Sequence, residues 1–172
     1  MTHAYKAYLP LIVIGILAIA FAVGAAAMLI FQLQPPIPSS APKTPNVNIV
    51  LYEGEMPNGE FGFGTAPNNL TSPGPTLGFS TSDLVNITVM NVGKLPHAFA
   101  ITTMPTVGSP VLFGAVIGSA TNPLQPGQEG SVVFAPNNAA FDYYYISPVA
   151  GDVTNGMYGD VVVSSVTGPA FP

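Results

Sequence analysis

The chain has 172 residues and a formal net charge of −5, with only 6% charged residues against 48% hydrophobic ones. It contains no cysteine, which excludes disulfides, thiolate metal sites, iron–sulfur clusters and cysteine nucleophiles. Its three Lys and Arg residues are too few to form a basic patch, so no nucleic-acid partner is expected.

The shortage of acidic groups bears on the surroundings of the protein. The chain has only eight Asp and Glu residues, so few carboxylates must be protonated as the pH falls. This composition favours an extracytoplasmic domain that faces acidic surroundings. A surface covered by lipid or by other subunits accounts for the low charge equally well.

The first predicted element is a membrane anchor. Residues 9–33 contain no charged residue and consist mostly of Leu, Ile, Val, Ala and Phe, a length that spans a hydrocarbon core as one α-helix. Residues 1–8 carry Lys6 and form a short cytoplasmic N-terminus, which places the C-terminal domain outside the cell membrane. Alanine recurs at every fourth position on one face of this helix, which favours packing against other membrane helices.

A proline-rich linker, residues 34–45, leads from the anchor into a predicted all-β domain over residues 46–166, with a tail at 167–172. Runs rich in Val, Ile, Phe and Tyr alternate with turns there, as in a β-sandwich or barrel. The predicted strands are 47–52, 84–90, 97–101, 131–134, 142–146 and 158–163.

Two Asn-x-Thr triplets in this domain, beginning at Asn69 and at Asn86, match the acceptor motif for N-glycosylation. Such triplets also arise by chance. The sequence alone therefore leaves the modification of either asparagine open.

Residues near the end of the domain have the spacing of a copper-binding loop. A blue-copper site uses a thiolate, two imidazoles and a weak axial thioether. Ser147 stands at the thiolate position, Asp152 at an imidazole position five residues later, and Met157 at the axial position after five more. An upstream segment, residues 91–99, contains His97.

These segments resemble the cupredoxin family over residues 46–166, and the loop spacing is close to that of the rusticyanins and the archaeal sulfocyanins. The resemblance implies a cupredoxin-like Greek-key β-sandwich, with His97 at the position of the first copper-binding imidazole. His97 and Met157 keep the family pattern, whereas Ser147 and Asp152 depart from it. We therefore expect a degenerate copper site without metal. A weak Cu(II) or zinc site that uses His97, Asp152 and Met157 is the alternative.

Other motifs do not indicate a catalytic site. The run 59–64 has the glycines of a phosphate loop but the wrong spacing and no following helix, so a turn is predicted. Glu53 and Glu55 lie on one face of a strand, where a solvated strand end is expected rather than an acid–base pair. A Ser-His-Asp triad would require His97, and no nucleophile elbow is present. No catalytic or cofactor-binding residue is predicted.

One anchor followed by one small cupredoxin domain resembles the compact subunit II of heme–copper oxidases, in particular the metal-free form in archaeal quinol oxidases. The resemblance implies a non-catalytic subunit that stabilises a membrane respiratory complex in a thermoacidophile. It implies no cofactor in this chain, heme and copper in partner subunits, and contacts with integral membrane subunits and lipid. The alternatives are a membrane-tethered electron carrier with an atypical metal site and a surface or envelope interaction module.

Overall fold

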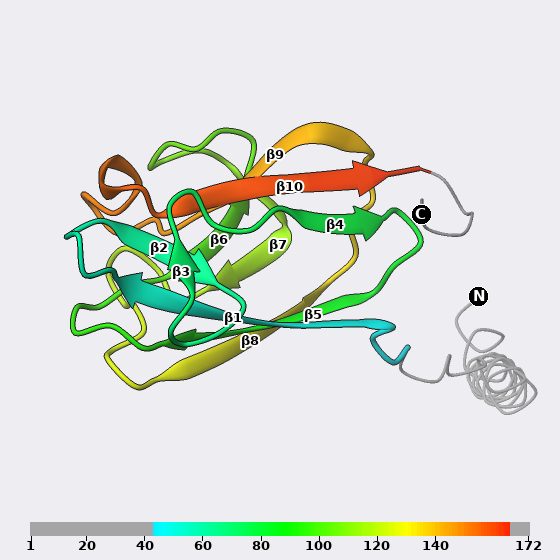
Figure 1. The fold of residues 1–172 in the computed structure, drawn as a ribbon. Coiled ribbons are helices and arrows are strands. Elements are labelled where there is room, and N and C mark those ends of the chain that lie inside the picture. Colours follow the sequence, from blue (N-terminus) through cyan, green and yellow to red (C-terminus); the bar gives the residue numbers. More distant parts are fainter. Residues whose placement is uncertain (1–42, 166–172) are drawn as a thin grey trace, which may run out of the picture. The chain divides into compact units, whose positions relative to one another are not determined.

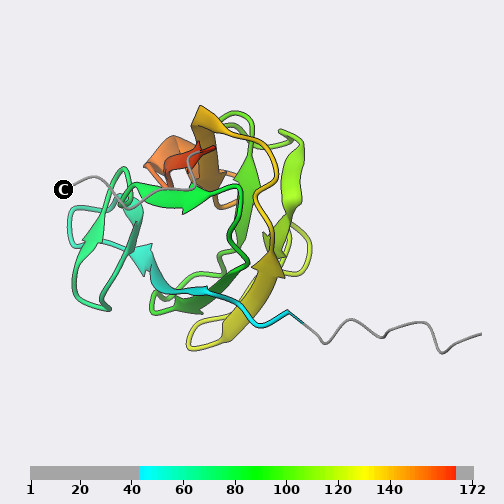
Figure 2. The same cartoon turned by 90° about the vertical axis from the view of Figure 1, so that its right-hand side faces the viewer.

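The computed structural model describes residues 43–165, which form two five-stranded β-sheets packed face to face (Figures 1 and 2). In spatial order, the first sheet contains β3 (Leu70–Thr71), β2 (Phe61–Gly64), β1 (Val47–Glu55), β5 (Val85–Asn91) and β8 (Glu129–Phe134). The second contains β4 (Leu77–Ser80), β10 (Tyr158–Ser164), β9 (Ala140–Ile146), β6 (Phe99–Thr102) and β7 (Val111–Ile117). A short 3-10 turn, η1 (Val153–Asn155), lies between β9 and β10. The predicted all-β sandwich is confirmed.

The connections between strands tie the two layers together. β1 pairs in parallel with β5, and β4 pairs in parallel with β10, while the other neighbours within the sheets are antiparallel. Parallel neighbours cannot be joined by a tight hairpin, so the chain crosses to the other sheet between them. The parallel pairs therefore bring together segments that are distant in the sequence.

Inward-facing apolar side chains of both sheets fill the interior. In β5, Val85, Ile87 and Val89 are fully buried and alternate with half-buried residues, as expected for a strand with one face on the core. The core draws on nearly every strand of both sheets; its larger buried members are Leu51, Phe63, Leu77, Phe79, Phe99, Ile101, Ile117, Phe134, Tyr145 and Met157.

Tyr145 lies at the centre of this core. Its ring stacks on Phe99 with the ring centroids 5.7 Å apart, and it meets Phe63 of the opposite sheet edge-on at 5.0 Å. Its hydroxyl donates a hydrogen bond of 2.7 Å to the carbonyl of Pro75, so the one polar atom of this buried side chain has a partner.

Gly159 is expected to be essential for this packing. It lies opposite Tyr145 in the pairing of β10 with β9, and a Cβ added at Gly159 would overlap the tyrosine ring. The fully buried ring has no room to move, so Gly159→Ala should lower the free energy of unfolding by about 2 kcal/mol. Gly78→Ala on the adjacent strand β4 is the control, because nothing lies within 4 Å of a Cβ there. Equal urea-unfolding midpoints for the two variants would contradict this expectation.

Each of the six predicted strands overlaps an observed strand, although 84–90 and 97–101 begin before β5 and β6 do, and β2, β3, β4 and β7 were not predicted. The turn predicted over residues 59–64 is wrong for residues 61–64, which form β2. Gly62 and Gly64 are needed there as strand residues, since the backbone carbonyls of β3 and its preceding turn lie where a Cβ would be.

The described residues include no helix long and apolar enough to span a membrane. The predicted anchor at 9–33, most of the linker at 34–45 and the tail at 167–172 lie outside the described residues.

Candidate functional site

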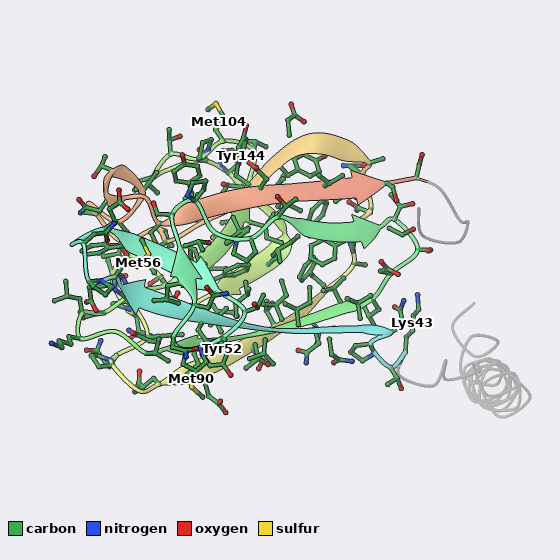
Figure 3. The ribbon with its side chains drawn as sticks, viewed as in Figure 1. Lys43, Tyr52, Met56, Met90, Met104 and Tyr144 are labelled. Atoms are coloured by element: carbon green, nitrogen blue, oxygen red, sulfur yellow. The ribbon has the colours of Figure 1, made fainter. Side chains whose placement is uncertain are left out.

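Several polar side chains gather inside one end of the sandwich. This is the end to which β1 and β5 point, and the β9–β10 connection folds over it (Figure 1). Figure 3 marks it by Met56, whereas Lys43, where the described chain begins, lies at the opposite end. The side chains come from β1, from the β5–β6 connection and from the β9–β10 connection. They are Glu53, Glu55, His97, Ser147 and Asp152, here called the polar cluster.

Asp152 is the hub of the polar cluster. Its Oδ2 lies 2.8 Å from His97 Nδ1 and accepts a hydrogen bond of 2.5 Å from the Ser147 hydroxyl. The Ser147 oxygen in turn accepts a hydrogen bond of 3.2 Å from the backbone amide of Ala98. His97 and Ser147 are fully buried and Asp152 is 3% exposed. These bonds therefore join the β5–β6 segment to the β9–β10 segment inside the protein.

The backbone of the β9–β10 connection holds Asp152 in place. The Asp152 carbonyl accepts hydrogen bonds of 3.0 Å from the amides of both Asn155 and Met157. Gly156 ends this turn with φ 96°, a left-handed conformation that favours glycine, and its carbonyl accepts a hydrogen bond from Ser72. Met157 is fully buried. The loop is thus closed by its own backbone.

The Nε2 side of the His97 ring faces Glu55. His97 Nε2 lies 3.6 Å from Glu55 Oε1, which is too long for a hydrogen bond. The Glu55 carboxylate accepts hydrogen bonds of 2.7 Å from the backbone amides of Lys94 and Leu95, which fix it at the rim of the cluster. The rings of Phe61 and His97 meet edge to face, with their centroids 5.3 Å apart.

The expectation of a solvated strand end at Glu53 and Glu55 is wrong for Glu53. This side chain is fully buried, and neither of its carboxylate oxygens has a hydrogen-bond partner among the described residues. The reason is that β1 continues three residues beyond its predicted end. Glu53 follows the fully buried Leu51 by two positions, so it points into the interior as Leu51 does. That parity was visible in the sequence once the strand was extended.

Burial and charge shift the pKa values within the polar cluster. Burial raises the pKa of Glu53 from 4.5 to about 8, and the charge of His97 only partly opposes this rise. Burial alone would lower the pKa of His97, but the hydrogen bond and charge of Asp152, with the charges of Glu53 and Glu55, raise it above its usual value. Burial likewise acts to raise the pKa of Glu55, but its backbone hydrogen bonds and the charge of His97 lower it.

The polar cluster is not a Ser-His-Asp catalytic triad. In a triad the histidine lies between the other two side chains and takes the serine proton. Here Asp152 lies in the middle, and Ser147 donates to the carboxylate rather than to the imidazole. Ser147 is also fully buried, so it offers no accessible nucleophile.

The same residues do not fit a blue-copper centre. The chain has no thiolate to offer, and Ser147 at that position uses its hydroxyl proton in a hydrogen bond. His97 Nδ1 is hydrogen-bonded to Asp152. Within residues 43–165, no group of three or more His, Asp or Glu side chains is arranged to hold a metal ion.

Comparison with known families agrees with this fold. A model of the multicopper oxidase family, Cu-oxidase_3, matches residues 65–167, which is more than half of the chain. The chain belongs to the multicopper oxidase family. The matched region includes His97, Ser147, Asp152 and Met157, of which the first three are joined by hydrogen bonds. No curated relative matches the chain.

Solved structures of copper proteins share the fold of this family member. Rusticyanin from Thiobacillus ferrooxidans is 22% identical with a TM-score of 0.52, covering 71% of this chain and 79% of its own. Copper nitrite reductase from Nitrosomonas europaea is 19% identical with a TM-score of 0.52, covering 73% of this chain and 44% of its own. A multicopper oxidase from Pseudomonas thermotolerans is 19% identical with a TM-score of 0.50, covering 72% of this chain and 31% of its own. The chain therefore spans less than half the length of the two enzymes.

Proposed function

We propose that this chain is a copper-free, non-catalytic subunit of a membrane respiratory complex of the heme–copper quinol oxidase type, in which its cupredoxin-like domain stabilises the assembly. The observation that carries the proposal is the position of Asp152. It is hydrogen-bonded to both His97 and Ser147, where the family pattern would place copper between its ligands.

The hydrogen bonds around Asp152 can replace the structural role of a metal. Copper in such a site would tie the β5–β6 segment to the β9–β10 loop. Here the bond between His97 and Asp152, with the bond that the Ala98 amide donates to Ser147, ties the same two segments. The domain can keep its shape without metal, but side chains of this kind supply no redox couple. A rigid domain without a redox couple suits a structural subunit better than an electron carrier.

Two features of the sequence support a membrane partner. Residues 9–33 form an uncharged apolar stretch long enough to cross a bilayer. The chain as a whole has 6% charged residues, which is compatible with a surface partly covered by other subunits. The proposal places the domain outside the cell membrane, with heme and copper in the partner subunits.

The test is to purify the chain from native membranes in mild detergent and to measure heme and copper in the preparation. The expected result is a heme-containing complex in which this chain is stoichiometric. A chain that purifies alone with one bound copper would instead be a tethered electron carrier. A chain that purifies alone without heme or copper would be an interaction module.

A matched pair of variants separates copper in this chain from copper in the partners. His97→Gln with Met157→Leu removes both side chains that keep the family pattern, whereas Met157→Leu alone controls for the change in core packing. The copper-to-heme ratio is expected to be the same in the wild-type complex and in both variants. A loss of one copper per complex in the double variant alone would assign that copper to His97.

A further inference from the structure

The structure distinguishes the two Asn-x-Thr triplets, which the sequence could not rank. N-linked glycans are bulky and hydrated, so an acceptor asparagine must stand on the surface with room around it. The two triplets lie in different places on the first sheet. Asn69 immediately precedes β3 at the sheet edge, whereas Asn86 lies within β5, between β1 and β8.

Asn69 stands in an exposed turn. Thr65 and the three residues 67–69 are exposed, and the Asn69 amide closes the turn with a hydrogen bond of 3.1 Å to the Ala66 carbonyl. Within residues 43–165, the Asn69 side chain makes no hydrogen bond. Thr71, the third residue of the triplet, is exposed, and its hydroxyl has only a contact of 3.5 Å with the Phe63 carbonyl. Both side chains that a glycosyltransferase must engage are accessible.

Asn86 is held within the sheet. Its Nδ2 donates a hydrogen bond of 3.3 Å to the Asn48 side chain, and its backbone is paired on one side with Asn48 and on the other with Val133. The hydroxyl of Thr88 is engaged with Ser131 at 2.8 Å. A glycan on Asn86 would rise from an inner strand of the sheet, next to the contact with Asn48.

We propose that Asn69 is an N-glycosylation site and that Asn86 is not. The Asn69 Nδ2 forms a bond to the anomeric carbon of an oligosaccharide carried on a lipid phosphate. The bond from that carbon to the phosphate oxygen breaks, the lipid phosphate leaves as an anion, and the amide nitrogen loses one proton. The inference rests on the extracytoplasmic placement in the proposed function.

The position of Asn69 also gives the glycan a physical role. β3 is the terminal strand of the first sheet, and an open sheet edge is a template for pairing with another chain. A glycan beside β3 blocks that approach. It also adds a hydrated surface to a domain with few charges, and this hydration does not depend on the ionisation of side chains.

The experiment is mass spectrometry of peptides from the chain produced in its own host, before and after release of N-glycans. We expect a glycan on the peptide that contains Asn69 and none on the peptide that contains Asn86. Asn69→Gln and Thr71→Ala should each abolish the modification, Thr71→Ser should retain it, and Asn86→Gln should leave it unchanged. An unmodified Asn69, or a glycan on Asn86, would overturn the inference.

A failure of the glycosylation inference can be told apart from a failure of the proposed function. If the chain purifies within a heme-containing complex but Asn69 is unmodified, only the glycosylation inference fails. If Asn69 carries a glycan but the chain purifies alone, the glycosylation inference stands and the role as an oxidase subunit fails.

Discussion

The folded domain is expected to lose stability as the pH rises from about 5 to about 9, the reverse of ordinary acid denaturation. The folded protein holds a proton on Glu53 up to a pKa of about 8, whereas the unfolded chain releases it near 4.5. Between these values the unfolded state binds fewer protons, so each rise in pH favours unfolding. A shift of this size corresponds to at most roughly 5 kcal/mol, and we expect a loss of several kcal/mol across the window.

His97 acts in the same direction. Its pKa is raised in the folded protein, so its contribution is fully present below the usual value of 6.5 and is lost as the pH rises through the folded pKa. Glu55 acts in the opposite direction, because its pKa is lowered; its contribution is present above 4.5 and is lost as the pH falls through the folded pKa. Glu53 and His97 therefore stabilise the folded protein most at weakly acidic pH.

Glu53→Gln isolates the largest of these contributions. The variant should match the wild type near pH 5, where Glu53 is protonated, and exceed it by several kcal/mol near pH 9. Urea-unfolding midpoints at a series of pH values measure the difference. Glu129→Gln removes an exposed carboxylate from β8 and should leave the pH dependence of the wild type unchanged. A Glu53→Gln variant with the same pH dependence as the wild type would show that burial of Glu53 is not its cause.

The second large effect concerns copper. The double substitution Ser147→Cys with Asp152→His is expected to create a blue-copper centre with an intense thiolate-to-copper absorption band. The changes supply the missing thiolate and imidazole and release His97 Nδ1 from its bond to Asp152, while Met157 is already buried in the same loop. Copper affinity should rise by more than about a hundredfold, because loss of a single supporting partner of a ligand already costs 10–100-fold.

The metal-free double variant should be less stable than the wild type by about 2–4 kcal/mol, because it loses the buried hydrogen bonds around Asp152. Copper should restore that stability. Titration with Cu(II), followed by visible absorption and thermal unfolding, tests both points. Ser147→Cys alone and the double variant with His97→Gln are the controls, and each should bind copper more weakly. A folded double variant without the absorption band would falsify the view that the loop retains the geometry of a copper site.

Alternation along the chain was enough to predict the sandwich and its longer strands. In β5, inward Val85, Ile87 and Val89 are separated by polar residues, and this period of two is a local property of the sequence. The shorter strands could not be predicted in this way. β2 consists of alternating Phe and Gly, and only its pairing with β1 and β3 makes it a strand. Its glycines are explained by the close approach of a neighbouring backbone.

The candidate site, like the fold, could be predicted from the sequence only in part. The spacing of Ser147, Asp152 and Met157, with His97 upstream, identified the loop and its departure from a blue-copper pattern, because ligand spacing is written in one stretch of chain. Only the tertiary structure shows that His97 and Ser147 are hydrogen-bonded to Asp152 and that Glu53 is buried in the same cluster. The bond between His97 and Asp152 joins residues 55 positions apart, and the burial of Glu53 depends on strands packed over it from elsewhere in the chain. Desolvation is a property of the packed surroundings of a group, so no local pattern could reveal it.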